Sequence, residues 1–167
     1  MPSSIRSHQE STIIIGFGNI HYSDSSIGAR VADEVASWHL SEVLALTVRQ
    51  LTPDLSETLA KVGVAIFVDA SRVHQLHGIK IIPITPSSSN YPESSAKGWM
   101  KTSEPHSLIA LTQAAFGCYP QTYWIKVPAD DFFLGDHISP IAEQGIEAAL
   151  MSIESIIQYQ KLVRAAC

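Results

Sequence analysis

The sequence predicts an α/β protein, in which a mostly parallel sheet of about five strands lies between two layers of helices in a three-layer α/β/α fold. Short apolar segments rich in β-branched residues alternate with segments whose apolar residues recur at helical spacing. This alternation is typical of parallel strands joined by helices that cover both faces of the sheet. The 167 residues show no internal repeat and no linker, so we predict a single domain over 1–167.

The first half of the chain begins with an apolar strand over Thr12–Gly16, which a glycine ends. Apolar residues then recur every three to four positions, which predicts an amphipathic helix over about Ser26–Leu40. A second strand is expected over Val43–Gln50, where apolar and polar residues roughly alternate. Thr52 or Asp54 can then begin a short helix.

The second half continues the pattern with a fully apolar third strand over Val64–Val68, which stops at an aspartate. Further strands are expected over Gly78–Ile84 and Thr122–Val127. Between these two strands lies an apolar-faced segment over Pro105–Phe116, which we predict to be a helix. The final helix begins near Pro140 and carries an apolar stripe toward the end of the chain.

Two segments do not fit the alternation of strands and helices. Residues 1–10 are polar, and we predict a disordered tail there. Residues 85–104 are rich in Ser and Pro and have no helical or strand period. A segment of this length inside a compact domain is either disordered or functional, and we interpret it as a flap-like loop beside the site.

The composition excludes several classes of protein. The net charge of −5 and the lack of any Lys/Arg cluster argue against a nucleic-acid-binding surface. No apolar run approaches the roughly 18 to 20 residues that cross a bilayer, and the first ten residues lack the apolar core of a secretory signal. We therefore predict a cytoplasmic protein without a membrane partner. Cys118 and Cys167 form neither a metal-ligand spacing nor a disulfide framework.

The loop after the first strand, Gly16-Phe-Gly-Asn19, superficially matches a dinucleotide-binding turn. Such a turn needs a third glycine so that helix and strand pack closely around the pyrophosphate, but His21 stands at that position. The second strand also ends in Arg49 and Gln50, where a ribose-binding acid is expected. These departures disfavour a nucleotide site.

Three polar residues stand where the carboxyl edge of the predicted sheet places ligands. Asp24 follows the first strand, Asp69 follows the third, and His106 opens the helix that leads into the last strand. Two carboxylates and an imidazole suit a borderline divalent ion such as Ni²⁺ or Zn²⁺. The alternatives are that Asp24 and Asp69 cap a helix or turn and that His106 is an exposed first-turn residue.

Other polar residues are weaker candidates. Asp130, Asp131, Asp136 and His137 form a polar cluster that could line the same edge of the sheet, while His74 and His77 lie in a connection that we expect to face solvent. The pattern Gly-x-Ser-x-Gly does not occur, which disfavours a hydrolase with a serine nucleophile.

Taken together and in order, several short motifs resemble those of the [NiFe]-hydrogenase maturation proteases. Their later segments are similar to the branch that serves bidirectional, NAD(P)-linked hydrogenases. The motifs are Gly16-x-Gly-Asn19, Ser23-Asp24 with Gly28, Gln50-Leu-Thr-Pro-Asp-Leu55, Val68-Asp69-Ala70, Pro105-His106-Ser107-Leu108 and Phe133-x-Gly-x-x-Ile-Ser-Pro140.

The resemblance implies a three-layer α/β/α fold and an aspartyl-type, metal-dependent endopeptidase. Such an enzyme removes a C-terminal extension from the hydrogenase large-subunit precursor after nickel has been inserted. The Ni²⁺ would be carried by the substrate, with Zn²⁺ or Cd²⁺ able to replace it in vitro. The resemblance assigns metal contact to Asp69 and His106, and it makes Asp24 and Asp69 the expected catalytic residues, with Asp24 also near the metal.

The chain departs from this family at Ser25. The family carries a second acid after the aspartate of the first loop, and that second acid is the expected metal ligand, whereas this chain has Asp24-Ser25. Asp24 can take the place of that ligand if the loop rotates by one residue. The alternative function is a non-catalytic binding or assembly factor of the same fold.

Overall fold

A computed structural model describes residues 11–72, 77–86 and 104–166 of the chain. The predicted tail over 1–10, most of the predicted flap over 85–104, and His74 lie outside these described residues. The described part contains one five-stranded sheet with the strand order β2-β1-β3-β5-β4. The strands are β1 (Thr12–Phe17), β2 (Val43–Val48), β3 (Val64–Arg72), β4 (Lys80–Ile84) and β5 (Gln121–Ala129).

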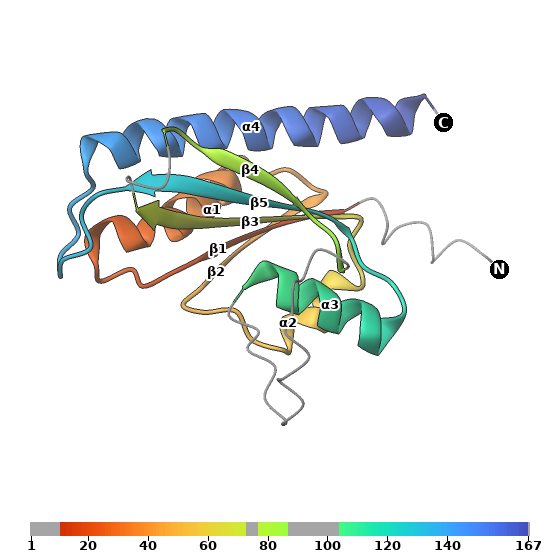
Figure 1. Cartoon of the computed structure of the whole chain (residues 1–167). Coiled ribbons are helices and arrows are strands. Elements are labelled where there is room, and N and C mark those ends of the chain that lie inside the picture. Colours follow the sequence, from red (N-terminus) through yellow and green to blue (C-terminus); the bar gives the residue numbers. More distant parts are fainter. Residues whose placement is uncertain (1–10, 73–76, 87–103, 167) are drawn as a thin grey trace, which may run out of the picture.

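Four helices cover the sheet in three layers (Figure 1). The long helix α4 runs along one side of the sheet together with α1, and α2 and α3 lie on the other side. The bounds are α1 (Ile27–Ser37), α2 (Leu55–Leu59), α3 (Pro105–Phe116) and α4 (Pro140–Ala165), with a 3-10 turn at Ser23–Ser26 before α1. The predicted three-layer α/β/α fold is confirmed.

Strand alternation divides the apolar core into two clusters. Even-numbered residues of β1 and β3, such as Ile14 and Ile66, pack toward α1 and α4. Odd-numbered residues, such as Ile15 and Phe67, pack toward α2 and α3. These side chains are fully buried, so the sheet is apolar on both faces, as parallel sheets require.

The helix ends follow local sequence signals. Pro105 stands at the first position of α3, and Gly117 ends that helix with a left-handed φ of +71°. The Ser139 side chain caps α4 by accepting from the Ala142 N–H, and Pro140 follows it. The predicted bounds of α3 and the predicted start of α4 are therefore confirmed.

The observed strands differ from the predicted ones in their bounds and add one antiparallel pairing. β3 does not stop at Asp69 but continues to Arg72, because β5 extends alongside it and supplies parallel partners up to Ala129. β4 is antiparallel to β5, which makes the sheet mixed, whereas β1, β2, β3 and β5 pair in parallel. The predicted mostly parallel sheet of about five strands is thus confirmed, and the structure adds that the edge strand β4 runs antiparallel.

Glycines let β1 and α1 approach each other closely. A Cβ at Gly16 would lie 1.9 Å from the Gly28 carbonyl oxygen. A Cβ at Gly28 would lie 2.6 Å from both the Phe17 nitrogen and the Val68 oxygen. Side-chain atoms do not fit into these gaps, so the glycines of the opening loop serve helix–strand packing.

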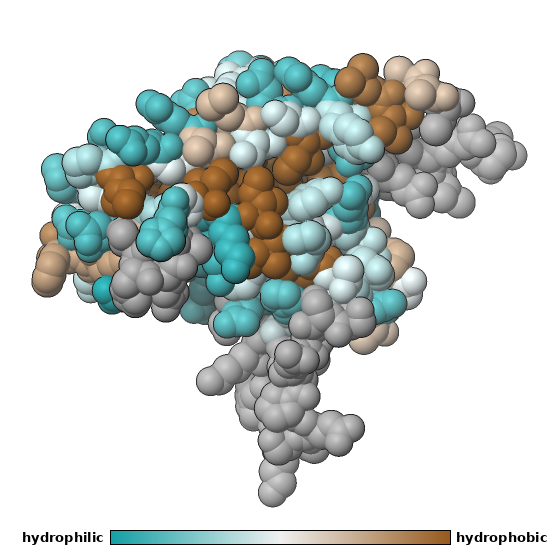
Figure 2. Space-filling view, turned by 45° about the horizontal axis from the view of Figure 1, so that its top comes forward, coloured by the Kyte–Doolittle hydropathy of each residue, from teal (hydrophilic) through white to brown (hydrophobic). Residues whose placement is uncertain are grey.

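Several large apolar side chains are exposed on the surface. Figure 2 shows apolar surface in the middle of one face, bordered by polar side chains along the top. Among the described large apolar side chains, Phe133 and Leu134 are the most exposed, at 82% and 76%. Within the described ranges, no helix is both long and apolar enough to cross a lipid bilayer.

Candidate functional site

The order of the strands places a topological switch point at the carboxyl ends of β1 and β3. β2 and β3 lie on opposite sides of β1, so the connections leaving β1 and β2 run in opposite directions across the sheet. Open α/β sheets bind ligands at such a switch point. Gly16 and Gly18 leave β1 at this edge, and Asp69 pairs with Lys126 near the same edge of β3 and β5.

Asp69 is held by a tryptophan on the neighbouring strand. The Trp124 indole Nε1–H donates a hydrogen bond of 2.8 Å to Asp69 Oδ1. Both residues point to the face of the sheet that α2 and α3 cover, because Trp124 belongs to the same core cluster as Phe67, two residues before Asp69. The carboxylate therefore lies at the boundary of that apolar cluster, toward the carboxyl ends of the parallel strands.

The same tryptophan ring also contacts His106 and Lys126. The His106 and Trp124 rings meet edge to face, with their centroids 5.9 Å apart. The Lys126 Nζ lies 3.9 Å from the centre of the Trp124 ring, a cation–π contact. Asp69, His106 and Lys126, which come from β3, α3 and β5, are thus gathered around one indole.

The burial of this group changes its acid–base properties. Burial raises the pKa of Asp69 to about 6, although the Trp124 hydrogen bond and the Lys126 charge act in the opposite direction. The Glu104 charge adds to the rise. Burial also lowers the pKa of the His106 imidazole below its usual value, an effect that Glu104 opposes and Lys126 assists. A carboxyl that titrates near neutral pH at a sheet edge is typical of a functional site.

Asp24 is fully buried and holds two loops together. Its Oδ2 accepts hydrogen bonds from the Asp130 and Asp131 backbone N–H groups at 2.8 and 2.9 Å, and from the Ser139 hydroxyl at 2.6 Å. Its Oδ1 accepts from the Ser139 backbone N–H at 2.9 Å. Burial by itself would raise the pKa of Asp24, but these hydrogen bonds outweigh it and lower the pKa below its usual value.

The structure brings two of the three predicted site residues together. Asp69 and His106 meet at Trp124, whereas Asp24 is bound to the loop over 130–139. No three His, Cys, Asp or Glu side chains lie close enough to hold one metal ion in the part of the chain that is described. The alternative of Asp24 as a helix cap does not apply either, since no side-chain hydrogen bond caps the turn at Ser23–Ser26 or α1.

The weaker candidates have local structural roles or are exposed. Asp130 and Asp131 donate backbone N–H groups to Asp24. The Asp136 carbonyl accepts a hydrogen bond of 2.9 Å from the Arg30 guanidinium. His77 is exposed, as expected from the sequence.

Trp124, Lys126 and Glu104 did not emerge as site residues from the sequence. Trp124 could have been found, because the N–H of a buried indole needs a hydrogen-bond acceptor and an aspartate ends the neighbouring apolar segment. Lys126 follows two positions later on the same face of β5 and could have been found by this spacing. No signal in the sequence pointed to Glu104.

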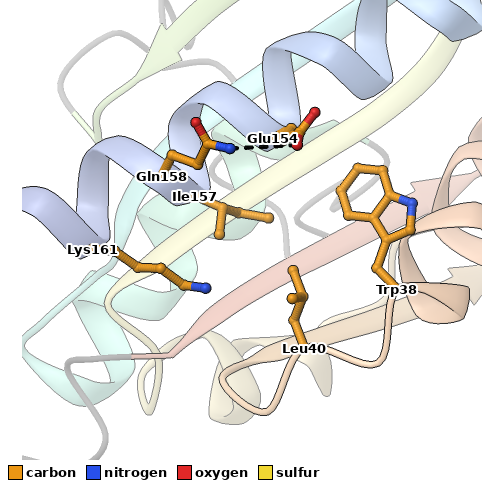
Figure 3. Close-up of a pocket in the computed structure, with 6 residues that line it drawn as sticks. All are labelled: Trp38, Leu40, Glu154, Ile157, Gln158 and Lys161. Atoms are coloured by element: carbon orange, nitrogen blue, oxygen red, sulfur yellow. Dashed lines mark hydrogen bonds between the residues drawn. The ribbon is translucent and has the colours of Figure 1, made fainter.

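A cavity of about 330 Å³ lies elsewhere, between the end of α1 and the C-terminal half of α4 (Figure 3). Its lining residue Leu40 accepts a backbone hydrogen bond from Val43, the first residue of β2, so the cavity lies near the amino ends of the parallel strands, opposite the end that holds Asp69. None of its lining residues belongs to the predicted site. They are Trp38, Leu40, Glu154, Ile157, Gln158 and Lys161.

Several solved structures with a similar fold are described as hydrogenase maturation proteases. The chain is similar to the hydrogenase maturating endopeptidase HybD from E. coli, with 17% identity and a TM-score of 0.69 over 89% of this chain and 93% of that one. It is similar to the [NiFe] hydrogenase maturation protease HycI from Thermococcus kodakarensis, with 18% identity and a TM-score of 0.67 over 89% and 93%. For the hydrogenase 2 maturation peptidase from a Thaumarchaeota archaeon, the values are 18%, 0.64, 89% and 98%.

These likenesses extend over nearly the whole length of both chains and confirm the fold that the resemblance implied. No protein-family model and no curated protein sequence matches the chain. At identities of 17% and 18%, shared structure does not transfer an activity, so the function has to be argued from the site.

Proposed function

We propose that this protein is an endopeptidase that removes the C-terminal extension of a [NiFe]-hydrogenase large-subunit precursor after nickel insertion. The observation that carries the proposal is the meeting of Asp69 and His106 at Trp124, on the carboxyl edge of the sheet. The fold shared with structures described as hydrogenase maturation proteases supports the choice of substrate. The cytoplasm as its location stays a prediction.

The chemistry of the donor set fits a nickel ion that arrives with the substrate. A carboxylate oxygen and an imidazole nitrogen are suitable ligands for a borderline divalent ion. Two protein donors leave coordination positions for groups of the precursor, which agrees with the lack of a three-residue set among the described side chains. The ion would contribute Lewis acidity at the scissile peptide.

Asp69 is suited to contact the nickel ion. Its pKa of about 6 leaves the carboxylate mostly ionised at pH 7.5, which is the form that binds a metal ion. One oxygen accepts the Trp124 N–H, so the ion carried by the substrate would approach the other. Asp24 enters the proposal as the group that ties the loop after β1 to the loop over 130–139, since its oxygens already accept four hydrogen bonds.

The second candidate is a factor that binds the precursor without cutting it. Ser25 favours it, because a hydroxyl is a weaker ligand for a divalent ion than the acid that the family carries at this position. Ser25 lies in the turn at Ser23–Ser26, next to the fully buried Asp24. Hydrogen bonds at Asp24 on both oxygens oppose the loop rotation that would let Asp24 replace the missing acid.

Incubation with nickel-loaded precursor separates the two candidates. The peptidase shortens the large subunit by a defined mass, which intact-protein mass spectrometry detects. Asp69→Ala and His106→Ala should each abolish this mass loss, while His77→Ala, which removes an exposed histidine, should leave it unchanged. A stable complex with no mass loss over hours would refute the peptidase and leave the binding factor.

A Ser25→Glu variant tests the mapped ligand position. If the first loop faces the nickel, the new carboxylate should tighten Ni²⁺ binding by about tenfold or more, measured by isothermal titration calorimetry. Ser41→Glu, on an exposed turn before β2, adds the same charge away from the site and serves as the control. Equal affinities in Ser25→Glu and the unaltered chain would place this loop outside the metal's reach.

A further inference from the structure

We propose that Trp124 is the positioning residue of the site, fixing the Asp69 carboxylate and the His106 ring relative to each other so that both can contact nickel. This inference deepens the proposed function and rests on it for the identity of the metal. Trp124 itself would touch neither the metal nor the peptide.

The argument begins with the place of Trp124 in the sheet. It pairs with Phe67 in the parallel register of β3 and β5, and Lys126 pairs with Asp69. Phe67 and Asp69 point to the same face, as do Trp124 and Lys126, since residues two apart share a face of a strand. The indole can therefore reach diagonally across to the next residue on the same face of β3, where its Nε1–H donates to Asp69 Oδ1 at 2.8 Å.

The next step concerns how tightly the indole itself is held. Trp124 is only 7% exposed and packs in the core cluster with Phe67 and Leu108, so its ring has little freedom to turn. The Lys126 ammonium lies 3.9 Å from the ring centre. A rigid ring with one polar atom gives the carboxylate a fixed direction, and it directs the remaining oxygen to a ligand.

The same ring fixes the second donor. His106 packs edge to face against it at 5.9 Å between centroids, from the first turn of α3. A single side chain thus orients one donor from β3 and one donor from α3, two elements that are not adjacent in the sequence. Groups that orient metal ligands in this way typically affect metal affinity by about 10- to 100-fold when they are replaced.

The test measures Ni²⁺ binding to the isolated chain, without precursor, by isothermal titration calorimetry. Trp124→Phe keeps an aromatic ring in the core but removes the N–H donor, and it should weaken Ni²⁺ binding by about 10-fold or more. Trp38→Phe makes the same replacement at the cavity in Figure 3 and should not change the affinity. In an Asp69→Ala background, Trp124→Phe should have less than a twofold further effect, because it acts through that carboxylate.

A direct readout of the contact comes from the indole itself. In a ¹⁵N-labelled chain, the Trp124 Nε1–H resonance should shift clearly in Asp69→Asn and Asp69→Ala, while the Trp38 resonance stays in place. Circular dichroism confirms that each variant is folded.

Three results would overturn the inference. The first is a folded Trp124→Phe chain that binds Ni²⁺ as tightly as the unaltered chain. The second is an equal effect of Trp124→Phe on Ni²⁺ affinity with and without Asp69, and the third is an unaltered chain that takes up no Ni²⁺ at millimolar concentration. Failure of the proposed function has a different signature. A chain whose Ni²⁺ binding depends on Trp124, but which never shortens the precursor, would refute the peptidase and retain the positioning role.

Discussion

The burial of Asp69 should destabilise the folded protein at neutral pH, and Asp69→Asn should relieve this cost. The pKa of Asp69 rises from an ordinary value of 3.8 to about 6 on folding, chiefly because the side chain is buried. One pKa unit corresponds to about 1.4 kcal/mol, so keeping this carboxylate ionised in the folded chain costs about 3 kcal/mol. Asparagine carries no charge at any pH and still offers an oxygen to the Trp124 N–H.

The sign of the pH dependence follows from the raised pKa. Below pH 3.8 the carboxyl is protonated in both the folded and the unfolded chain, so aspartate and asparagine should give similar stabilities. As the pH rises through about 6, the folded chain loses the favourable protonated form, and the variant should become about 3 kcal/mol more stable than the unaltered chain. For a chain of this length, the difference corresponds to a midpoint of thermal unfolding about 6–12 °C higher.

Urea unfolding followed by far-UV circular dichroism at pH 4 and pH 8 measures this difference. Asp54→Asn, which removes an exposed carboxylate before α2, is the matched control and should change the stability by less than about 0.5 kcal/mol at either pH. The reasoning is refuted if Asp69→Asn is no more stable than the unaltered chain at pH 8. An equal gain at both pH values would also refute it, because the gain would then not come from ionisation.

Two further substitutions test the frame around the site by the same urea assay. Asp24→Asn places an amide NH₂ among the donors of the loop over 130–139, and we expect a loss of about 3 kcal/mol or more at pH 7. The pKa of Asp24 is lowered on folding, so its carboxylate stabilises the folded chain above pH 3.8. The stability lost in Asp24→Asn should therefore shrink as the pH falls below 3.8. A loss of stability that does not change with pH would contradict this role. Gly28→Ala places a methyl group 2.6 Å from the Phe17 nitrogen and the Val68 oxygen. This overlap should destabilise the fold by about 3 kcal/mol or leave the chain insoluble. Unchanged stability would show that α1 can move away from the sheet.

Much of the fold could be predicted because its signals are local. The β-branched run of β1 and the proline and glycine at the ends of α3 act within a few residues, and those elements lie where the sequence placed them. The direction of β4 could not be predicted in this way. Strand direction depends on how the chain returns to the sheet, and β4 pairs with a β5 that follows it by some forty residues.

For the candidate site, too, some features could be predicted from the sequence and others could not. Position along the chain was enough to select Asp69 and His106, because a residue that follows an apolar strand segment, or that opens a helix leading into the next strand, lies toward the carboxyl edge of a parallel sheet. The same rule selected Asp24 as well, but it could not tell that this carboxylate would be enclosed. Its partners lie 106 to 115 residues away in the chain.

The sequence by itself determined the alternation of strands and helices, the glycines that allow β1 and α1 to touch, and the acid and histidine at the edge of the sheet. Only the tertiary structure decided which of these polar groups face one another. In the folded chain, Asp24 connects two loops through hydrogen bonds, and Trp124 contacts Asp69, His106 and Lys126. The physical reason is that strand and helix periods depend on neighbouring residues, whereas hydrogen bonds to a buried carboxylate depend on groups that only the folded sheet brings within 3 Å.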